Sequence, residues 1–312
     1  MGRRRKGRKI NGIVLLDKPL GITSNRALQI VKRLYKAAKA GHTGSLDPLA
    51  TGLLPLCLGE ATKVSGFLLD ADKSYLATLK LGIKTASADA EGEIIETRPV
   101  ENYTKKELKA AIDPFLGDIE QVPPMHSALK VDGQPLYKLA HQGVVIERKS
   151  RPVHIFAIEV LRHEDDEIDI EVHCSKGTYI RTLAEDIGEK LGCGAHLSAL
   201  RRTKSGPFDL DECITLEELE QLAEKSEEAG FDKMDSILMP AEEALYDWES
   251  IDLSSDAAYY ICRGQAVQVP NAPTEGLVRL FSEEKGFLGI GEITSDGRVK
   301  PNRLFVFENN AD

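Results

Sequence analysis

The order of apolar and polar positions predicts a mixture of strands and helices in the first third of the chain. Residues 10–16 (INGIVLL) are apolar enough for a buried strand. Residues 74–81 alternate apolar and polar side chains, as a strand with one buried face does. Between them, residues 25–38 place apolar side chains on one face of a helix and basic side chains on the rest. A capping box formed by Thr104 and Glu107 predicts that a further helix begins there.

The remaining pattern continues this mixture. Strands are predicted near 154–162 and 168–174, followed by a helix with an apolar stripe at about 178–191. From about 252, short strands with the cores VRLF, FLGIGEI and RLFVF are separated by glycine turns. Strands and helices do not alternate as β-α-β units, so the pattern favours the α+β class.

A loop rich in glycine, threonine and proline is predicted at 41–52 (GHTGSLDPLATG). Its glycines permit tight backbone turns, and Asp47-Pro48 suits the beginning of a helix or a turn. Spacing alone leaves two interpretations of Asp47 open. It is either the cap of a following helix or a carboxylate that takes part in chemistry.

The net charge of −10 is an average over two unlike parts. Residues 1–204 contain 32 Lys and Arg against 26 Asp and Glu, whereas residues 205–312 contain 8 against 24. A polyanion is therefore expected to meet the first part. The acidic residues of 209–256 are expected to cover solvated helices.

The cysteines and histidines give no support for a metal site. The five cysteines are spread along the chain without a C-x-x-C pair, and the seven histidines show no i, i+4 pairing. No apolar run approaches the ~18 residues that a membrane span needs. The basic N-terminus is not followed by a signal-type apolar stretch. We therefore expect a reduced, cytoplasmic protein without a membrane anchor.

Six ordered motifs between Asp17 and Thr203 resemble those of the bacterial TruB-type tRNA pseudouridine synthases. The longest is GHTGSLDPLATG, continued by LLP and GEATK. The others are DKPxGxTS, KSYxA, PPxxSALK, GTYIR and HLxxLRRT. The resemblance implies a catalytic domain with a mixed, largely antiparallel sheet flanked by helices. It also implies that the chain isomerises the uridine at position 55, in the T-arm of tRNA, to pseudouridine after flipping the base. This isomerisation requires no cofactor.

The resemblance also assigns catalytic roles to three residues. Asp47 matches the attacking carboxylate, whose target, the uracil ring or the ribose, stays open. Arg181 matches the partner of that carboxylate; its plainer interpretation is a surface helix arginine. An adjacent guanidinium typically lowers an aspartate pKa by ~1–3 units, which would keep Asp47 ionised. Tyr75 matches the aromatic residue against the target base and the favoured acceptor of the C5 proton. Without the resemblance, Tyr75 is a core residue of an alternating strand.

Substrate-binding roles follow from the same match. Tyr179 and Leu200 correspond to walls of the uracil pocket, and Lys18 lies in the DKPxGxTS motif. His42 corresponds to the side chain that fills the space left by the flipped base. A basic segment, 121–152, matches one that closes over the RNA. Its side chains are expected to contact phosphates, Lys130, Arg148 and Arg151 among them.

The expected domain organisation follows from these matches. A basic tip at 1–9 precedes the catalytic domain at 10–250, which includes the acidic helices at 209–250. Residues 251–312 resemble the PUA module, a small β-rich RNA-binding domain. Two positions depart from the family pattern: His126 replaces a usual tyrosine, and TASAD at 85–89 replaces T-x-T-x-D.

Two other functions remain as alternatives. One is an RNA chaperone or tRNA-binding module in which catalysis is incidental. The other is a guide-RNA-dependent pseudouridine synthase of the archaeal and eukaryotic kind. The joint presence of Asp47, Tyr75 and Arg181 favours an enzyme, and the closing segment resembles the stand-alone bacterial type. We expect a monomer without an obligate protein partner, metal or cofactor.

Overall fold

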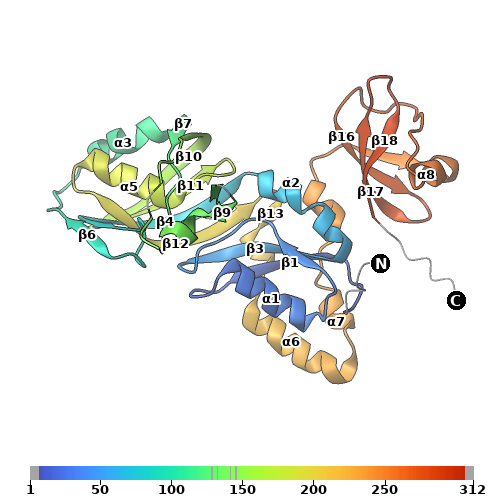
Figure 1. The fold of residues 1–312 in the computed structure, drawn as a ribbon, viewed down its shortest axis with the longest axis horizontal. Helices are drawn as coiled ribbons and strands as arrows, with labels where there is room; N and C mark the ends of the chain where they lie inside the picture. Colours follow the sequence, from blue (N-terminus) through green and yellow to red (C-terminus); the bar gives the residue numbers. More distant parts are fainter. Residues whose placement is uncertain (1–6, 128, 132, 141, 145, 306–312) are drawn as a thin grey trace.

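A large twisted sheet and a separate small sheet organise the protein (Figure 1). The computed structural model describes residues 7–305, except residues 128, 132, 141 and 145. In the large sheet the strand order is β14-β1-β3-β12-β4-β11-β10-β7, with β13 beside β12 and β2 beside β3. These strands are β1 (Gly12–Lys18), β2 (Ala40–His42), β3 (Ala50–Leu58), β4 (Lys73–Leu81), β7 (Gly117–Gln121), β10 (Arg151–Glu164), β11 (Glu167–Cys174), β12 (Ala195–Ser205), β13 (Phe208–Asp209) and β14 (Ile214–Thr215).

The sheet is mixed and largely antiparallel, as the resemblance implied. Only two of its described pairs are parallel, β1 with β14 and β3 with β12. Outside it lie two short hairpins, β5 (Ile83–Thr85) with β6 (Ile94–Thr97) and β8 (Lys130–Val131) with β9 (Gln134–Pro135). The predicted α+β class is therefore confirmed.

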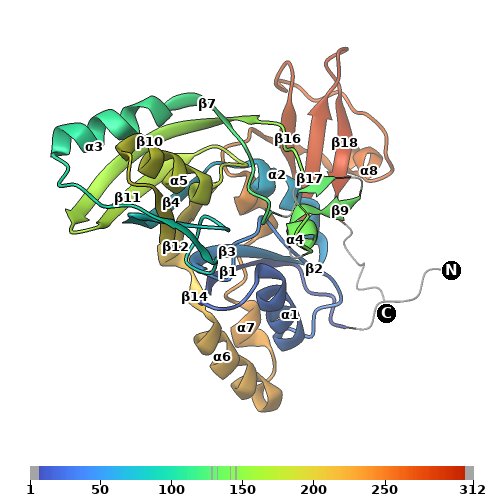
Figure 2. The ribbon, with the colours of Figure 1, turned by 60° about the vertical axis from the view of Figure 1, so that its left-hand side comes forward.

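Helices cover the sheet in two groups (Figure 2). The helices α3 (Lys105–Ile112) and α5 (Ile180–Leu191) pack on β4 and β11, where Leu79, Ile170 and Leu183 are fully buried. The helices α1 (Ser24–Leu34) and α6 (Leu216–Ala229) pack on one face of β1 and β3. The remaining helices are α2 (Ser65–Asp70), α4 (Leu136–Ala140), α7 (Asp232–Asp235) and α8 (Ser255–Ile261).

The apolar run at the start of the chain reflects burial on both faces of β1. Val14 and Leu16 face α1 and α6, while Ile13 and Leu15 face the opposite core. A strand covered on both faces has no solvent side and therefore shows no alternation. The capping box of Thr104 and Glu107 is present at the beginning of α3.

The small sheet consists of β15 (Ser250–Leu253), β16 (Leu277–Ser282), β17 (Gly286–Ile293) and β18 (Val299–Leu304). It packs on the large sheet through Phe287 and Ile290, which share a core with Ile13 and Leu53. The Lys63 ammonium also donates to the Leu304 carbonyl at 2.6 Å. The predicted strand RLFVF was placed too late, because β18 ends at Leu304; its residues 306 and 307 lie outside the described residues.

The predicted loop at 41–52 is shorter than expected. β2 continues to His42 and β3 begins at Ala50, so only 43–49 lie outside strands. Pro55 lies within β3, although proline cannot donate a ladder hydrogen bond and is rare in central strands. In β3 it sits between the stretch paired with β12, 50–52, and the stretch paired with β2, 56–58. Neither β12 nor β2 needs a backbone N–H donor from residue 55, so β3 tolerates proline there.

The close approach of β3 to β12 predicts that Gly52→Ala is strongly destabilising. Gly52 has a φ of +98°, and an added Cβ would lie 2.3 Å from the Arg202 carbonyl oxygen. Backbone strain and overpacking together should lower the free energy of unfolding by about 2–5 kcal/mol, measured by urea denaturation. Gly192→Ala is the matched control, with a φ of +86° and no atom within 4 Å of the added Cβ. Equal losses in the two variants would contradict this account.

Candidate active site

A cavity of about 310 Å³ opens where β3, β12 and β4 lie side by side. Segments far apart in the sequence supply its walls. They are the loop at 44–47, β4, the segment 126–127, the turn before α5 and β12. Five residues singled out from the sequence line it: Asp47, Tyr75, Tyr179, Arg181 and Leu200.

The loop that carries Asp47 is held from outside by the DKPxGxTS motif. The buried Ser24 hydroxyl donates to the Leu46 carbonyl at 3.0 Å and accepts from the Leu46 amide at 2.7 Å. The Gly21 amide donates to the Pro48 carbonyl at 2.8 Å. No helix follows Asp47, because the chain enters β3 directly. The helix-cap interpretation of Asp47 is therefore wrong.

Arg181 bridges two carboxylates. It lies in the first turn of α5, and its guanidinium is 3.1 Å from Asp47 Oδ2 and 3.2 Å from Asp89 Oδ2. Solvent reaches only 6% of the Arg181 side chain and 3% of the Asp89 side chain. The carbonyls of Ser87 and His126 accept further hydrogen bonds from the same guanidinium, at 3.3 and 2.7 Å. The bridge fixes the guanidinium on all sides except that of the cavity.

Sequence reasoning missed Asp89. It is the last residue of TASAD, which had been treated only as a departure from the family pattern. The Ser87 hydroxyl and the Glu91 amide both donate to Asp89 Oδ1, which leaves Oδ2 for Arg181. The preserved aspartate of the expected T-x-T-x-D run was the signal that could have identified it.

Burial raises the pKa of Asp47, and the neighbouring carboxylate of Asp89 adds to the increase. The positive charges of Arg181 and Lys18 oppose it. The expected lowering of this pKa by Arg181 is therefore outweighed by the loss of water around the carboxyl group. Solvent still reaches 43% of the Asp47 side chain, which limits the increase.

Tyr75 projects from β4 at the position that pairs with Arg202 of β12. Burial raises the pKa of its hydroxyl, and Arg202 lowers it through both its charge and a hydrogen bond. Arg202 is 1% exposed, and its Nε donates to the Leu53 carbonyl at 2.7 Å. Sequence reasoning also missed this second arginine of the site, although it had quoted the motif that contains it.

The opposite wall is formed by Tyr179 and Leu200. The side-chain amide of the buried Gln121 donates from Nε2 to the Tyr179 backbone carbonyl at 3.1 Å. Its Oε1 accepts from the Tyr179 backbone N–H at 2.7 Å. This pair of bonds fixes the backbone just before α5 begins. Leu200 lies between Ala50 and Ala77 in register, so it fills the gap between β3 and β4.

Lys18 and His42 lie outside the lining of the cavity. Lys18 is fully buried and donates to the Pro19 and Ile22 carbonyls at 2.9 and 2.7 Å. Burial lowers its pKa to about 8. Burial also lowers the pKa of His42, which favours the neutral ring.

The lysine and arginine side chains of 121–152 that the structure describes do not line the cavity. Arg148 is half-buried, and Arg151 is exposed at the beginning of β10. The side chain of Lys130 lies outside the described residues. No helix among the described residues is long and apolar enough to cross a membrane. Within the same residues, no group of three or more His, Cys, Asp or Glu side chains is placed to hold a metal ion.

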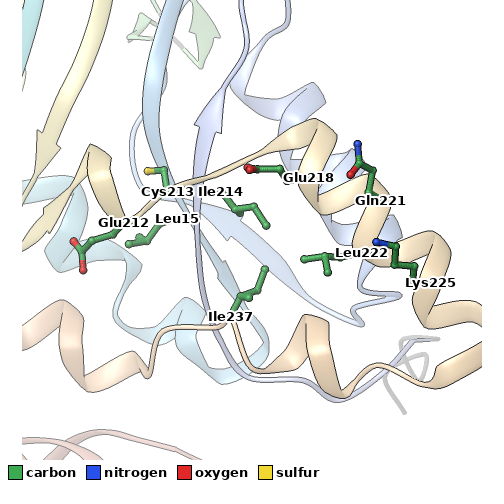
Figure 3. Close-up of a pocket in the computed structure, with 9 residues that line it drawn as sticks. All are labelled: Leu15, Glu212, Cys213, Ile214, Glu218, Gln221, Leu222, Lys225 and Ile237. Atoms are coloured by element: carbon green, nitrogen blue, oxygen red, sulfur yellow. The ribbon is translucent and has the colours of Figure 1, made fainter.

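A larger cavity, of about 460 Å³, lies beside α6 and holds none of the predicted site residues (Figure 3). Leu15, Ile214, Leu222 and Ile237 form its apolar part. Burial raises the pKa of the Cys213 thiol there to about 12, so the thiol is not a nucleophile at neutral pH. The smaller cavity therefore remains the candidate site.

Three family models match consecutive parts of the chain. They are described as TruB family pseudouridylate synthase (N terminal domain) over residues 32–180, tRNA pseudouridylate synthase B C-terminal domain over 181–246, and Pseudouridine synthase II TruB, C-terminal, over 250–305. The chain is 56% identical over 307 residues to the tRNA pseudouridine synthase B of Nitrosococcus oceani, covering 98% of each chain. It is 55% identical over 305 residues to that of Stutzerimonas stutzeri, covering 98% of this chain and 99% of the relative.

Solved structures give the same fold at lower identity. A chain from the crystal structure of a Cbf5-Nop10-Gar1 complex matches with a TM-score of 0.72 and 29% identity, over 95% of this chain and 84% of that chain. A chain from the structure of an H/ACA RNP bound to a substrate RNA containing 2'-deoxyuridine matches with a TM-score of 0.74 and 25% identity, over 99% of this chain and 92% of that chain.

The bridge predicts that Arg181→Met is strongly destabilising. The substitution leaves Asp89 buried without its cation, and breaking a buried pair from one side typically costs about 3–5 kcal/mol. Lys109→Met is the control, since it removes an exposed pair with Asp113 on α3 and should cost less than about 1 kcal/mol. Urea denaturation of both variants measures the difference. Similar losses would show that the bridge does not hold this part of the fold.

Proposed function

Because the chain belongs to the TruB family of pseudouridylate synthases, we propose that it isomerises uridine to pseudouridine in tRNA, with Asp47 as the nucleophile. The reaction breaks the N-glycosidic bond, turns the uracil and joins its C5 to the ribose. It includes no redox step, phosphoryl transfer or hydrolysis. The groups that the chemistry needs are therefore a nucleophile, a base and walls that hold the detached ring.

The contact of 3.1 Å between Asp47 and Arg181 carries this proposal. The guanidinium occupies one side of the carboxylate, and its positive charge opposes the increase of the Asp47 pKa that burial causes. The cavity lies on the other side, where an oxygen of Asp47 is available for attack. Asp89 fixes the guanidinium, so the nucleophile is held before the substrate arrives.

The cavity volume of about 310 Å³ lies within the range of small-molecule sites, ~300–1,000 Å³. A uridine must leave its stack to enter it, which costs a few kcal/mol. Tyr75, Tyr179 and Leu200 supply flat or apolar walls for the uracil. His42 is the last residue of β2, just before the loop that carries Asp47. We propose that its side chain fills the space that the flipped base leaves in the RNA stack; such stacking is worth ~1–3 kcal/mol.

The T-arm of tRNA is the proposed substrate element. The basic first part of the chain supports binding to a polyanion, and we propose that Lys130, Arg148 and Arg151 contact phosphates. Lys18 is buried beneath the loop of Asp47, so its substrate role is indirect: its charge lowers the pKa of Asp47. We assign catalysis to residues 10–250 and further RNA binding to the PUA-like residues 251–312. We propose that the enzyme acts in the cytoplasm as a monomer.

A guide-RNA-dependent enzyme is the second candidate, because the fold also matches chains from Cbf5 complexes. The identity to those chains is 29% and 25%, against 56% to a tRNA pseudouridine synthase B. This difference supports the stand-alone activity. A binding module alone would not need a carboxylate held at a cavity by a buried arginine.

Replacement of the nucleophile gives the first functional prediction. Asp47→Asn keeps the size of the side chain but removes the charge that attacks, so pseudouridine formation should be abolished. Affinity for tRNA should persist, because it depends on phosphate contacts elsewhere. Pseudouridine is measured in tRNA after single-turnover incubation, and affinity by filter binding. Substantial turnover by Asp47→Asn would exclude Asp47 as the nucleophile.

Tyr75→Phe separates a proton acceptor from a wall of the pocket. The ring remains, so affinity for a T-arm stem-loop should be retained. Loss of the hydroxyl should slow the single-turnover rate by ~10²–10⁴-fold, which is the usual contribution of general base catalysis. A Phe variant with the wild-type rate would reduce Tyr75 to a wall of the pocket.

A further inference from the structure

Arg202 is a buried cation without an acidic partner. It is the largest fully buried side chain among the described residues, at 1% exposure. Its Nε donates to the Leu53 carbonyl, and Nη2 has no hydrogen-bond partner in the described part of the chain. None of the ion pairs between described residues includes it. A buried charge normally requires a counter-charge, so this position calls for a functional explanation.

Gly44 and Gly52 of the motif GHTGSLDPLATG make room for Arg202. Arg202 pairs with Gly52 of β3 on one side and with Tyr75 of β4 on the other. Without a Cβ at Gly52, β12 approaches β3 closely. A Cβ on Gly44 would lie 3.6 Å from Arg202 Nη1, so this second glycine backs the guanidinium. The backbone therefore places Arg202 opposite Tyr75 in the strand pair, and both residues line the cavity.

The other titratable groups around Arg202 are cations, neutral bases and the Cys213 thiol, whose pKa burial raises to about 12. The charge of Arg202 lowers the pKa of Lys18 on β1, His42 on β2 and Lys73 on β4. None of these can neutralise it. Tyr75 is the acidic residue that faces Arg202 across the β4–β12 strand pair, and Arg202 acts to lower the pKa of its hydroxyl.

Other groups facing Tyr75 act in the opposite direction. Burial raises the pKa of the hydroxyl, as do Cys174 on β11 and Asp47 on its loop. The charge and the hydrogen bond of Arg202 are the two influences that lower it. Arg181 is already committed to Asp47 and Asp89. The two arginines of the site thus serve different acidic groups, Arg181 the two carboxylates and Arg202 the Tyr75 hydroxyl.

We propose that Arg202 is a positioning residue that holds the Tyr75 oxygen and stabilises its ionised form, the tyrosinate that then accepts the C5 proton. This inference rests on the proposed function. Before the step, the Tyr75 hydroxyl releases its own proton to water. The C5–H bond then breaks, the proton joins the tyrosinate oxygen, and the C–H electron pair forms the C5–C6 double bond. In a ring without the carboxylate, the electron pair of the C6–N1 double bond moves to N1, which water then protonates. If the Asp47 carboxylate had added to the ring, the electron pair of the bond between them leaves with the carboxylate instead.

Arg202→Met tests the proposal, because methionine fills a similar volume without charge. Loss of an adjacent cation typically shifts a pKa by ~1–3 units, so the single-turnover rate near pH 7 should fall by ~10–10³-fold. The substrate is a T-arm stem-loop with hydrogen or deuterium at C5 of the target uridine. Slower proton removal should increase the primary isotope effect, which a purely structural defect would not do. Arg202→Lys keeps the charge but lacks the planar fork, so its rate should be intermediate.

Arg201→Met is the matched control on the same strand. Arg201 pairs with Asp17, with Nη2 at 2.6 Å from Oδ2, so its loss weakens an ion pair away from Tyr75. The isotope effect of this variant should match that of the wild type. An unchanged isotope effect in both Arg202 variants would overturn the proposal. If Arg202→Met does not fold, the isotope effect of Arg202→Lys decides: an increase supports the proposal, and no change overturns it.

Failure of the proposed function gives a different result. An inactive wild type, or a Tyr75→Phe variant with the wild-type rate, removes the base on which Arg202 is proposed to act. An active wild type, an impaired Tyr75→Phe variant and an unchanged isotope effect in the Arg202 variants would refute the role of Arg202 alone.

Discussion

The site depends on one buried guanidinium that two carboxylates share. Arg181 has 6% of its side chain exposed and contacts Asp47 and Asp89 together. One carboxylate would already balance its single positive charge, so the second adds a contact, and removing the arginine would leave Asp89 buried alone. Sharing one guanidinium with Asp89 therefore positions Asp47, the proposed nucleophile. It also ties the loop at 43–49, the turn at 85–89 and the beginning of α5 into one unit.

The sheet supplies the second constraint. β12 lies between β3 and β4, so the residues on these three strands face one another at a close and fixed spacing. Gly52 permits the close approach of β12 to β3. Leu200 and Arg202 of β12 face Ala77 and Tyr75 of β4. The proposed nucleophile and the proposed base therefore come from different elements, yet each lies beside a buried arginine. Such preorganisation reduces the reorganisation needed when the substrate binds.

Much of this arrangement could be predicted from local patterns. Alternation identified β4, the capping box identified the beginning of α3, and motif order identified Asp47, Tyr75 and Arg181 as candidates. β3 was missed because Pro55 and the flanking glycines are typical of a loop, and only its neighbours in the sheet make proline acceptable there. Asp89 and Arg202 were missed for a related reason. Their roles arise from pairing across the fold, which spacing along the chain does not encode.

The central claim is that this chain by itself isomerises a uridine of tRNA. The most direct measurement is the mapping of pseudouridine, at single-nucleotide resolution, in unmodified tRNA incubated with the purified protein, without guide RNA and with a metal chelator present. The account predicts one new pseudouridine, in the T-arm, formed to completion. Absence of pseudouridine, or its formation only after a guide RNA or a protein partner is added, would contradict the account.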